Sequence, residues 1–396
     1  MHVSAAHTGP APAPDPAPAP DPAPAPDPAP APDPVLAPAA SAPAPGPGPG
    51  PLPASAPAAG RAAALAGLGA YVPPRVLTNA ELCGQRPIGD EWIRERIGVA
   101  SRRIADGEAT VDLAVRAGRH ALTAAGVDSV DAVVLTTISP DRLLPAGAPE
   151  VAARLGLGTV PAFDLASGCS GFLYGLGVAT SMITGGAFGR VLLVASDVFS
   201  AFLDPQDWLM SAIFGDGAGA VVLHAAEAGA PGAFGPFDLG SDGAQADLLE
   251  VPGGGARARK RQLAEPGAEF SPYFRMDGPV VRKQAVVGMC DSVTRALHRA
   301  GWRPADLDVL VAHQANQRIL DGLTAELGLP PGRVLSHIET YGNAAAASVP
   351  VLLAQAAAAG TLSPGLRVAL TAYGAGLAWG STTLVWPEVR AVAEGG

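Results

Sequence analysis

The chain has 396 residues, of which 48% are hydrophobic and 16% charged, and it carries a formal net charge of −10 at pH 7. This length predicts two domains or one large duplicated domain, and the acidic balance argues against a broad nucleic-acid-binding surface. The 3 cysteines form no Cys-x-x-Cys pair, so they indicate neither a disulfide framework nor a zinc site.

Residues 1–59 are dominated by proline and alanine, and the hexapeptide Ala-Pro-Ala-Pro-Asp-Pro recurs through them. Dense proline removes backbone donors and fixes φ, so this segment is expected to be a disordered, polyproline-II-like extension. Two interpretations stay open for it, an inert extension or a docking arm. No apolar run reaches the length of a membrane span, and the start lacks the order of a signal peptide, so we expect a cytoplasmic protein with no membrane partner.

From about Arg61 onward the chain repeats itself. A helical pattern over 112–125 passes through Gly126 into a β-branched strand at 130–137, and a second helical pattern over 291–300 passes through Gly301 into a strand at 307–313. The segments 191–196 and 366–371 also resemble each other. Alternating helices and strands that occur twice predict two α/β halves packed together, which we place at 60–230 and 231–396.

Two further segments have a simple structural interpretation. The glycine-rich run 214–220 is not followed by Gly-Lys-Ser/Thr, so it predicts close helix–strand packing or positioning of a loop at the active site rather than a phosphate loop. The basic cluster 257–261 follows three glycines and is expected to be an exposed loop, with an acidic partner as the functional alternative.

Cys169 is the first candidate for chemistry. It lies between an apolar strand that ends at Leu165 and a helical pattern over 172–184, with small residues between them. A thiol at a helix N-terminus is favoured as thiolate, so its pKa is expected to be lowered. A buried structural cysteine is the alternative.

Two later segments favour the catalytic interpretation. His313 directly follows the strand of the second half, and Asn343 follows Gly342 before a run of alanines. Each residue alone has an ordinary structural explanation. Because ligands gather beyond the carboxyl ends of strands in α/β sheets, we expect the Cys, His and Asn to converge.

Several ordered motifs together resemble the β-ketoacyl-ACP synthase III family, the initiating ketosynthases of the thiolase-like superfamily. The resemblance runs from about Leu65 to Trp386. It rests on the motifs Asn79, 90–93 (DEWI), 214–219 (FGDGAG), 313–316 (HQAN) and 342–343 (GN). It implies a duplicated thiolase-like α/β fold, two pseudo-symmetric βαβ halves in layered α-β-α-β-α architecture, and a homodimer. Thiolases would have a second Cys near Gly374–Gly376, and elongating synthases a second His where this chain has Asn343.

The resemblance also implies a mechanism. Cys169 would be acylated by an acyl-CoA or acyl-carrier-protein primer, with the backbone N–H groups of Cys169 and Ala375 as the oxyanion hole. His313 and Asn343 would then stabilise the enolate formed when malonyl acyl carrier protein loses carbon dioxide, and the enolate would attack the acyl-cysteine. Coenzyme A enters as a substrate thioester, and no cofactor or metal is implied.

The positions that match substrate contacts are less distinctive. The residues implied to bind coenzyme A are Trp92, Arg96, Trp208, Gly278 and Asn316, and those implied to dock an acidic acyl carrier protein are Lys283 and Arg318. Trp92 is equally well explained as a core residue. Trp208 stands where the family typically has an Arg. This departure and the residues that flank Cys169 indicate a specialised pathway, such as polyketide starter-unit selection.

Two rival functions remain open from the sequence. One is an acyltransferase on the same scaffold that moves the acyl group from Cys169 to an alcohol, amine or thiol without decarboxylation. The other is a non-catalytic partner subunit, although such a chain usually lacks its nucleophile.

Overall fold

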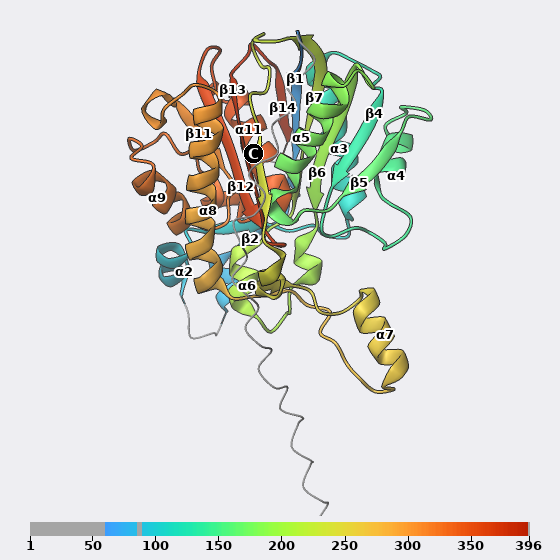
Figure 1. Cartoon of the computed structure of the whole chain (residues 1–396). Helices are drawn as coiled ribbons and strands as arrows, with labels where there is room; N and C mark the ends of the chain where they lie inside the picture. The colour runs from blue at the N-terminus through green and yellow to red at the C-terminus, as the bar shows by residue number, and fades with distance from the viewer. Residues whose placement is uncertain (1–59, 85–88, 395–396) are drawn as a thin grey trace, which may run out of the picture. The chain divides into compact units, whose positions relative to one another are not determined.

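The computed structural model describes residues 60–84 and 89–394. The extension predicted over 1–59 lies outside the described residues. The described chain is built around two sheets (Figure 1). The larger sheet has the order β14 (Ala391–Glu394), β1 (Arg61–Tyr71), β7 (Gly217–Glu227), β6 (Arg190–Asp197), β4 (Ala132–Thr136) and β5 (Ala162–Leu165). The smaller sheet has the order β11 (Val309–Ala312), β12 (Arg367–Gly374), β13 (Ala378–Val385) and β8 (Asp238–Ser241).

The second sheet repeats the pairing pattern of the first. In the first sheet β4 is parallel to β6, β6 is antiparallel to β7 and β7 is antiparallel to β1. In the second, β11, β12, β13 and β8 follow the same sequence of parallel, antiparallel and antiparallel pairs. A parallel bridge between Leu310 and Val334 occupies the place that β5 has beside β4. The predicted duplication is therefore confirmed.

Four helices complete five layers. Helix α3 (Thr110–Ala125) covers the outer face of the first sheet, and α8 (Gly278–Arg299) covers the outer face of the second. Between the sheets lie α5 (Gly171–Thr184) and α11 (Ser348–Ala358), whose apolar residues fill the central core. The predicted α-β-α-β-α layering is confirmed. The helices and strands that were predicted are present with shifted ends. The largest shift is at α8, which begins at Gly278, 13 residues before the start predicted at 291.

Close packing explains several glycines. A Cβ at Gly69 would lie 2.2 Å from the carbonyl oxygen of Ala117 on α3, and one at Gly219 would lie 2.7 Å from the backbone nitrogen of Val351 on α11. Strand and helix therefore touch through their backbones. The prediction that the run 214–220 serves helix–strand packing is confirmed.

One strand of the second half joins the sheet of the first half, across the predicted boundary at residue 230. The last strand, β14, returns from the second half and pairs in parallel with β1 of the first sheet, where Leu68 faces Ala391. The two sheets are otherwise built from segments on either side of that boundary, and the division into halves itself stays a prediction.

Smaller elements lie beyond the carboxyl ends of the main strands. Helices α2 (Asp90–Arg96) and α6 (Trp208–Ile213) lie there, and the two-stranded sheet of β9 (Leu249–Glu250) and β10 (Arg275–Met276) contributes to the same region. Besides short 3-10 segments, the other α-helices and strands of the described residues are α1 (Asn79–Cys83), α4 (Ala148–Arg154), α7 (Ala256–Ala264), α9 (Gln317–Glu326), α10 (Ile338–Tyr341), and the pair β2 (Val76–Thr78) and β3 (Ser101–Arg103).

The expectation of a loop over 257–261 is wrong, because these residues form α7. Alanine, arginine, lysine, glutamine and leucine all have high helix propensity, and Gly255 provides an extended start just before them. The three glycines therefore mark the end of the preceding loop, and they do not make the basic residues that follow part of it.

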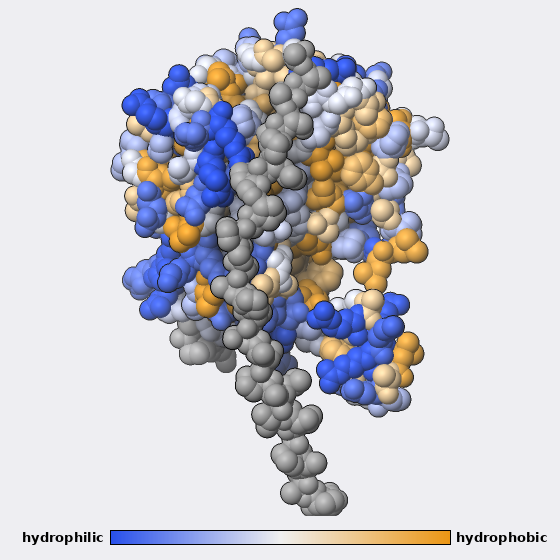
Figure 2. Space-filling model, viewed as in Figure 1, coloured by the Kyte–Doolittle hydropathy of each residue, from blue (hydrophilic) through white to orange (hydrophobic). Residues whose placement is uncertain are grey.

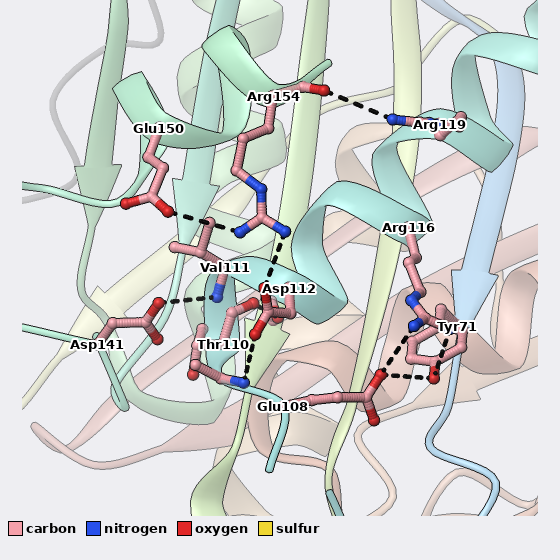
Figure 3. A network of polar contacts seen from close by, with 12 residues as sticks. Tyr71, Glu108, Thr110, Val111, Asp112, Arg116, Arg119, Asp141, Glu150 and Arg154 are labelled. Atoms are coloured by element: carbon pink, nitrogen blue, oxygen red, sulfur yellow. Dashed lines mark hydrogen bonds and ion pairs between the residues drawn. The ribbon is translucent and has the colours of Figure 1, made fainter.

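The outer surface of α3 carries a network of neutralised charges (Figure 3). Glu108 accepts a hydrogen bond from Tyr71 at 2.8 Å and pairs with Arg116, whose guanidinium lies over the Tyr71 ring. Asp112 pairs with Arg154 at 2.8 Å. Two of the arginines here therefore have a carboxylate partner, and the network joins α3 to β1 and α4.

Candidate active site

A cavity of about 430 Å³ lies at the carboxyl ends of the strands, and both halves of the chain contribute to its wall. The three side chains predicted to converge, Cys169, His313 and Asn343, all line it. They come from three separate segments: Cys169 precedes α5, His313 directly follows β11, and Asn343 lies five residues before α11. As predicted, the three residues converge on one cavity.

Glycines place Cys169 against the turn after β12. Cys169 lies in the short 3-10 segment Gly168–Ser170 that leads into α5, and Gly168 has φ of 54°. A Cβ at Gly168 would lie 2.6 Å from the nitrogen of Ala375, and one at Gly374 would lie 2.4 Å from the nitrogen of Cys169. The two turns interlock, so the backbone of Ala375 lies beside that of Cys169. Among the described residues, the N–H of Ala375 has no acceptor.

The expectation of a lowered thiol pKa is wrong for Cys169. Burial raises the pKa of the Cys169 thiol to about 12, and the nearby carboxylate of Asp197 raises it further. A hydrogen bond from the backbone N–H of Cys169 to its own sulfur lowers the pKa and opposes these effects. In this largely apolar cavity the loss of solvation outweighs the dipole of the following helix. The thiol is therefore neutral at pH 7 and must lose its proton during any reaction.

His313 is a neutral imidazole in a fixed orientation. Its backbone N–H donates to Thr371 on β12 at 2.9 Å, and its Nδ1 lies 2.7 Å from the hydroxyl of Ser348 at the start of α11. Burial lowers the pKa of His313 to about 3. Its Nε2 has no protein partner among the described residues and is free to exchange a hydrogen bond in the cavity.

The Asn343 amide is also oriented by the fold. Its side-chain Oδ1 accepts a hydrogen bond from the backbone N–H of Ala345 at 2.9 Å. The backbone N–H of Asn343 donates to the carbonyl of Ile213 at 2.9 Å. No partner for its Nδ2 occurs within the described ranges. Because the acceptor atom is occupied, the amide keeps its donor available, which suits a group that stabilises a developing oxyanion.

Trp92 and Arg96 form one side of the cavity mouth. Both line it from α2, and the Arg96 guanidinium lies 5.5 Å from the centre of the Trp92 ring. Asp90 at the start of α2 accepts a hydrogen bond from the buried Asn79 at 2.7 Å, which fixes the helix. The Trp92 side chain itself is half-buried in the cavity wall. Trp208 meets Trp92 edge-to-face at 5.8 Å and does not itself line the cavity.

The other predicted contact residues divide between two cavities. Gly278, Asn316 and Arg318 line the same cavity as Cys169, whereas Lys283 lines a neighbouring one between α8 and the β12–β13 hairpin. Asn316 also caps α9, since its side chain accepts a hydrogen bond from the N–H of Arg318 at 2.9 Å. These placements give each residue a position, and their roles in binding stay predictions.

Sequence reasoning missed three parts of the site. Phe199, Phe214 and Phe274 pack on one another in the cavity wall. Ser348 contacts His313, and the only feature of the sequence that could have pointed to it is its position directly after the alanine run. Asp197 is buried nearby, where it accepts hydrogen bonds from Thr137, Ser139 and the N–H of Ile138, and burial raises its pKa to about 6.

Two searches of the described residues bear on other classes of site. No group of three or more His, Cys, Asp or Glu residues in 60–84 and 89–394 is placed to hold a metal ion. Within the same ranges, none of the helices has both the length and the apolar character that crossing a bilayer requires.

Known proteins are similar to this chain over most of its length. The family "3-Oxoacyl-[acyl-carrier-protein (ACP)] synthase III" matches residues 163–243, and its C-terminal domain family matches residues 297–386. β-Ketoacyl-[acyl-carrier-protein] synthase III 5 of Streptomyces coelicolor is 49% identical over 331 residues, which cover 84% of this chain and 99% of that protein.

Solved structures agree. The 3-oxoacyl-(acyl carrier protein) synthase III of Pseudomonas aeruginosa PAO1 superposes with a TM-score of 0.78 at 48% identity, covering 83% of this chain and 99% of that one. The priming β-ketosynthase of the R1128 polyketide biosynthetic pathway gives a TM-score of 0.77 at 34% identity, with 83% and 97% covered. Because it shares their fold, is identical to them at nearly half of the aligned residues and spans them almost completely, this chain belongs to the β-ketoacyl-[acyl-carrier-protein] synthase III family.

Proposed function

We propose that the protein catalyses an initiating decarboxylative Claisen condensation, in which an acyl-thioester primer is joined to malonyl acyl carrier protein through an acyl group on Cys169. The observation that supports this most directly is the convergence of Cys169, His313 and Asn343 on one cavity. Family membership supports the same reaction.

The first step transfers the acyl group to Cys169. The sulfur attacks the thioester carbonyl, the thiol proton passes to the leaving thiolate, and His313 carries it because its neutral Nε2 is free. The N–H groups of Cys169 and Ala375 receive the negative oxygen of the tetrahedral intermediate. Removing one such donor typically costs about 3 kcal/mol of transition-state stabilisation.

The second step forms the carbon–carbon bond. His313 and Asn343 donate hydrogen bonds to the thioester carbonyl of the malonyl group, and they stabilise the enolate that remains when its carboxylate leaves as carbon dioxide. The enolate carbon attacks the acyl-cysteine carbonyl, and the C–S bond breaks to release β-ketoacyl thioester and the Cys169 thiolate, which takes one proton from solvent to restore the thiol. The apolar side chains in the cavity wall favour replacing a charged carboxylate by neutral carbon dioxide.

The orientation of the Ser348 hydroxyl sets which imidazole nitrogen carries the proton, and this lets His313 accept a proton during acylation and donate a hydrogen bond during condensation. When the Ser348 hydroxyl donates to the carbonyl of Ala345, 3.0 Å away, it accepts from Nδ1–H and leaves Nε2 as a proton acceptor. When the hydroxyl turns its proton toward Nδ1, the imidazole carries its proton on Nε2 and donates. The second arrangement is the one that the condensation needs.

The choice of primer and pathway belongs to the same proposal. Trp208 packs on Trp92 where the family typically has an Arg, so one cation that could meet coenzyme A phosphate is absent at this place. Similarity to a polyketide priming ketosynthase supports a role in starter-unit selection. Homodimerisation and a cytoplasmic location are part of the proposal and are tested by light scattering and by cell fractionation.

One experiment tests the function and separates it from its rivals. The protein is incubated with acetyl-, branched and longer acyl-CoA primers and analysed by intact mass, and ¹⁴C-carboxyl-labelled malonyl carrier protein is then added. We expect an acyl adduct followed by labelled carbon dioxide, and neither with C169S. The half-buried Cys290 provides the control variant C290S. An adduct without carbon dioxide release would favour the acyltransferase, and no adduct with any primer would favour the non-catalytic subunit.

A further inference from the structure

Helix α7 stands apart from the two sheets at the end of a long excursion (Figures 1 and 2). The excursion joins β9 to β10, and its base belongs to the active-site cavity, because Leu249, Phe274 and Met276 line that cavity. Only Ala258 of α7 is buried, and Leu263 is 84% exposed. The helix therefore adds little to the hydrophobic core.

The charges of α7 are unusual in this protein. The chain has a net charge of −10, yet α7 carries Arg257, Arg259, Lys260 and Arg261 within nine residues. Arg261 pairs with Glu265 at 3.2 Å, whereas the other three cations have no partner among the described residues. Arg116 and Arg154 on and beside α3, by contrast, both pair with carboxylates (Figure 3).

This arrangement is unfavourable for the helix by itself. Arg257 is followed by Lys260 at i+3 and by Arg261 at i+4, so like charges repel along one face. Short helices that bury little are also marginal in water. An acidic surface placed against α7 would remove the repulsion and would supply the missing ion pairs.

The cavity mouth extends the positive charge toward the reacting groups. Arg96, Arg282 and Arg318 line the cavity whose wall includes the base of the excursion. A ligand that is acidic over a protein-sized surface and also delivers a thioester would meet both sets of cations. Leu263 is the single large hydrophobic residue that α7 exposes, and the exposed Ala256 and Ala264 add little apolar area, which is too little for stable insertion into a membrane.

We propose that α7 is a docking element for the malonyl-loaded acyl carrier protein, additional to the cations at the cavity mouth. This inference rests on the proposed function. The acidic carrier binds α7 by charge complementarity, and the β9–β10 base holds that contact in a fixed relation to the cavity entrance. The contact acts on carrier capture and leaves the chemistry at Cys169 unchanged.

The test reverses the three unpaired charges in R257E/R259E/K260E. Condensation is measured with malonyl acyl carrier protein and with malonyl-pantetheine, which carries the same thioester without the protein. We expect kcat/KM for the carrier to fall at least about tenfold at low ionic strength, with an unchanged value for malonyl-pantetheine, and the difference to shrink in high salt. The matched control R75E/R119E/R390E makes the same change in net charge at exposed positions away from α7.

Each outcome decides the matter. An equal loss with both donors, no loss with either, or the same loss in the control variant would overturn the role of α7. Binding of the native protein, but not the α7 variant, to anionic phosphatidylglycerol vesicles, with unchanged carrier kinetics, would assign the helix to a membrane instead. If the wild-type protein condenses neither donor, the proposed function fails, and direct binding of the carrier to wild type and variant still tests the docking surface.

Discussion

The imidazole Nδ1 of His313 and the hydroxyl Oγ of Ser348 lie 2.7 Å apart, and both groups are buried. The hydroxyl is also within hydrogen-bonding distance of the Ala345 carbonyl and accepts from the N–H of Gln314. Ser348 is thus the one side chain bonded to the imidazole among the described residues. It fixes the ring and decides which nitrogen carries the proton.

We predict that S348A lowers kcat of condensation at least about tenfold while KM for the malonyl donor changes little, because Ser348 acts through His313 and does not touch substrate. The measurement is steady-state kinetics over a range of pH. The control is S292A, which removes another fully buried hydroxyl, one that donates to the carbonyl of Asp238. A rise in KM alone, or equal losses in both variants, would contradict a positioning role.

The pH dependence follows from the neutral imidazole. Burial lowers the pKa of His313 to about 3, so the group stays uncharged as the pH falls from 8 to 5 and would protonate only well below that range. Single-turnover condensation from a preformed acyl-enzyme should therefore show no inflection near pH 6.5. Asp197 has a pKa raised to about 6 and protonates within the range, so D197N is measured in parallel. An inflection near 6.5 that persists in D197N would disprove the prediction.

A methyl group at Gly168 should damage the site through the backbone. Its Cβ would lie 2.6 Å from the nitrogen of Ala375, so G168A is expected to separate the two oxyanion donors and to slow acylation by at least about 100-fold. Gly158 provides the control. It also has a positive φ, 73°, but no atom lies within 4 Å of an added Cβ. G158A should cost about 1 kcal/mol in the free energy of unfolding and leave the acylation rate intact. Equal rates in the two variants would contradict the interlocked turns.

Arg96 should contribute to primer binding and not to chemistry. R96A removes a cation that lines the cavity mouth, and a lost charge-assisted hydrogen bond to phosphate of about 1.5 kcal/mol corresponds to an increase in KM for acyl-CoA of roughly tenfold at unchanged kcat. The control is R75A, which removes an exposed arginine paired with Glu81. An unchanged KM would indicate that the primer does not use this side of the mouth.

The fold and the centre of the site were predictable because their signals are local and repeated. Two copies of a helix, a glycine and a β-branched strand indicated the duplication, and the strand ends placed Cys169 and His313 at equivalent edges. Residues whose role depends on contacts across the fold gave no such signal. The sequence shows a hydroxyl after the alanine run, but it does not mark Ser348 as the neighbour of a histidine 35 positions away.

The raised pKa of Cys169 was unpredictable for a related reason. The helix start that favours the thiolate is visible in the sequence, but the burial of the sulfur and the position of Asp197 are consequences of tertiary packing. For the basic run at 257–261 the local signal itself was sufficient, because its residues are good helix formers and the glycines end just before the helix begins.

The pairing of β14 with β1 constrains how the chain is made. The first residues of the larger sheet are synthesised more than 300 positions before their parallel neighbour, as the register of Leu68 with Ala391 records. On the ribosome, this edge of the sheet therefore stays uncovered until residues 391–394 have been made. A stop codon just before Ala391 would leave it so permanently, and the shortened product would offer an open strand for self-association.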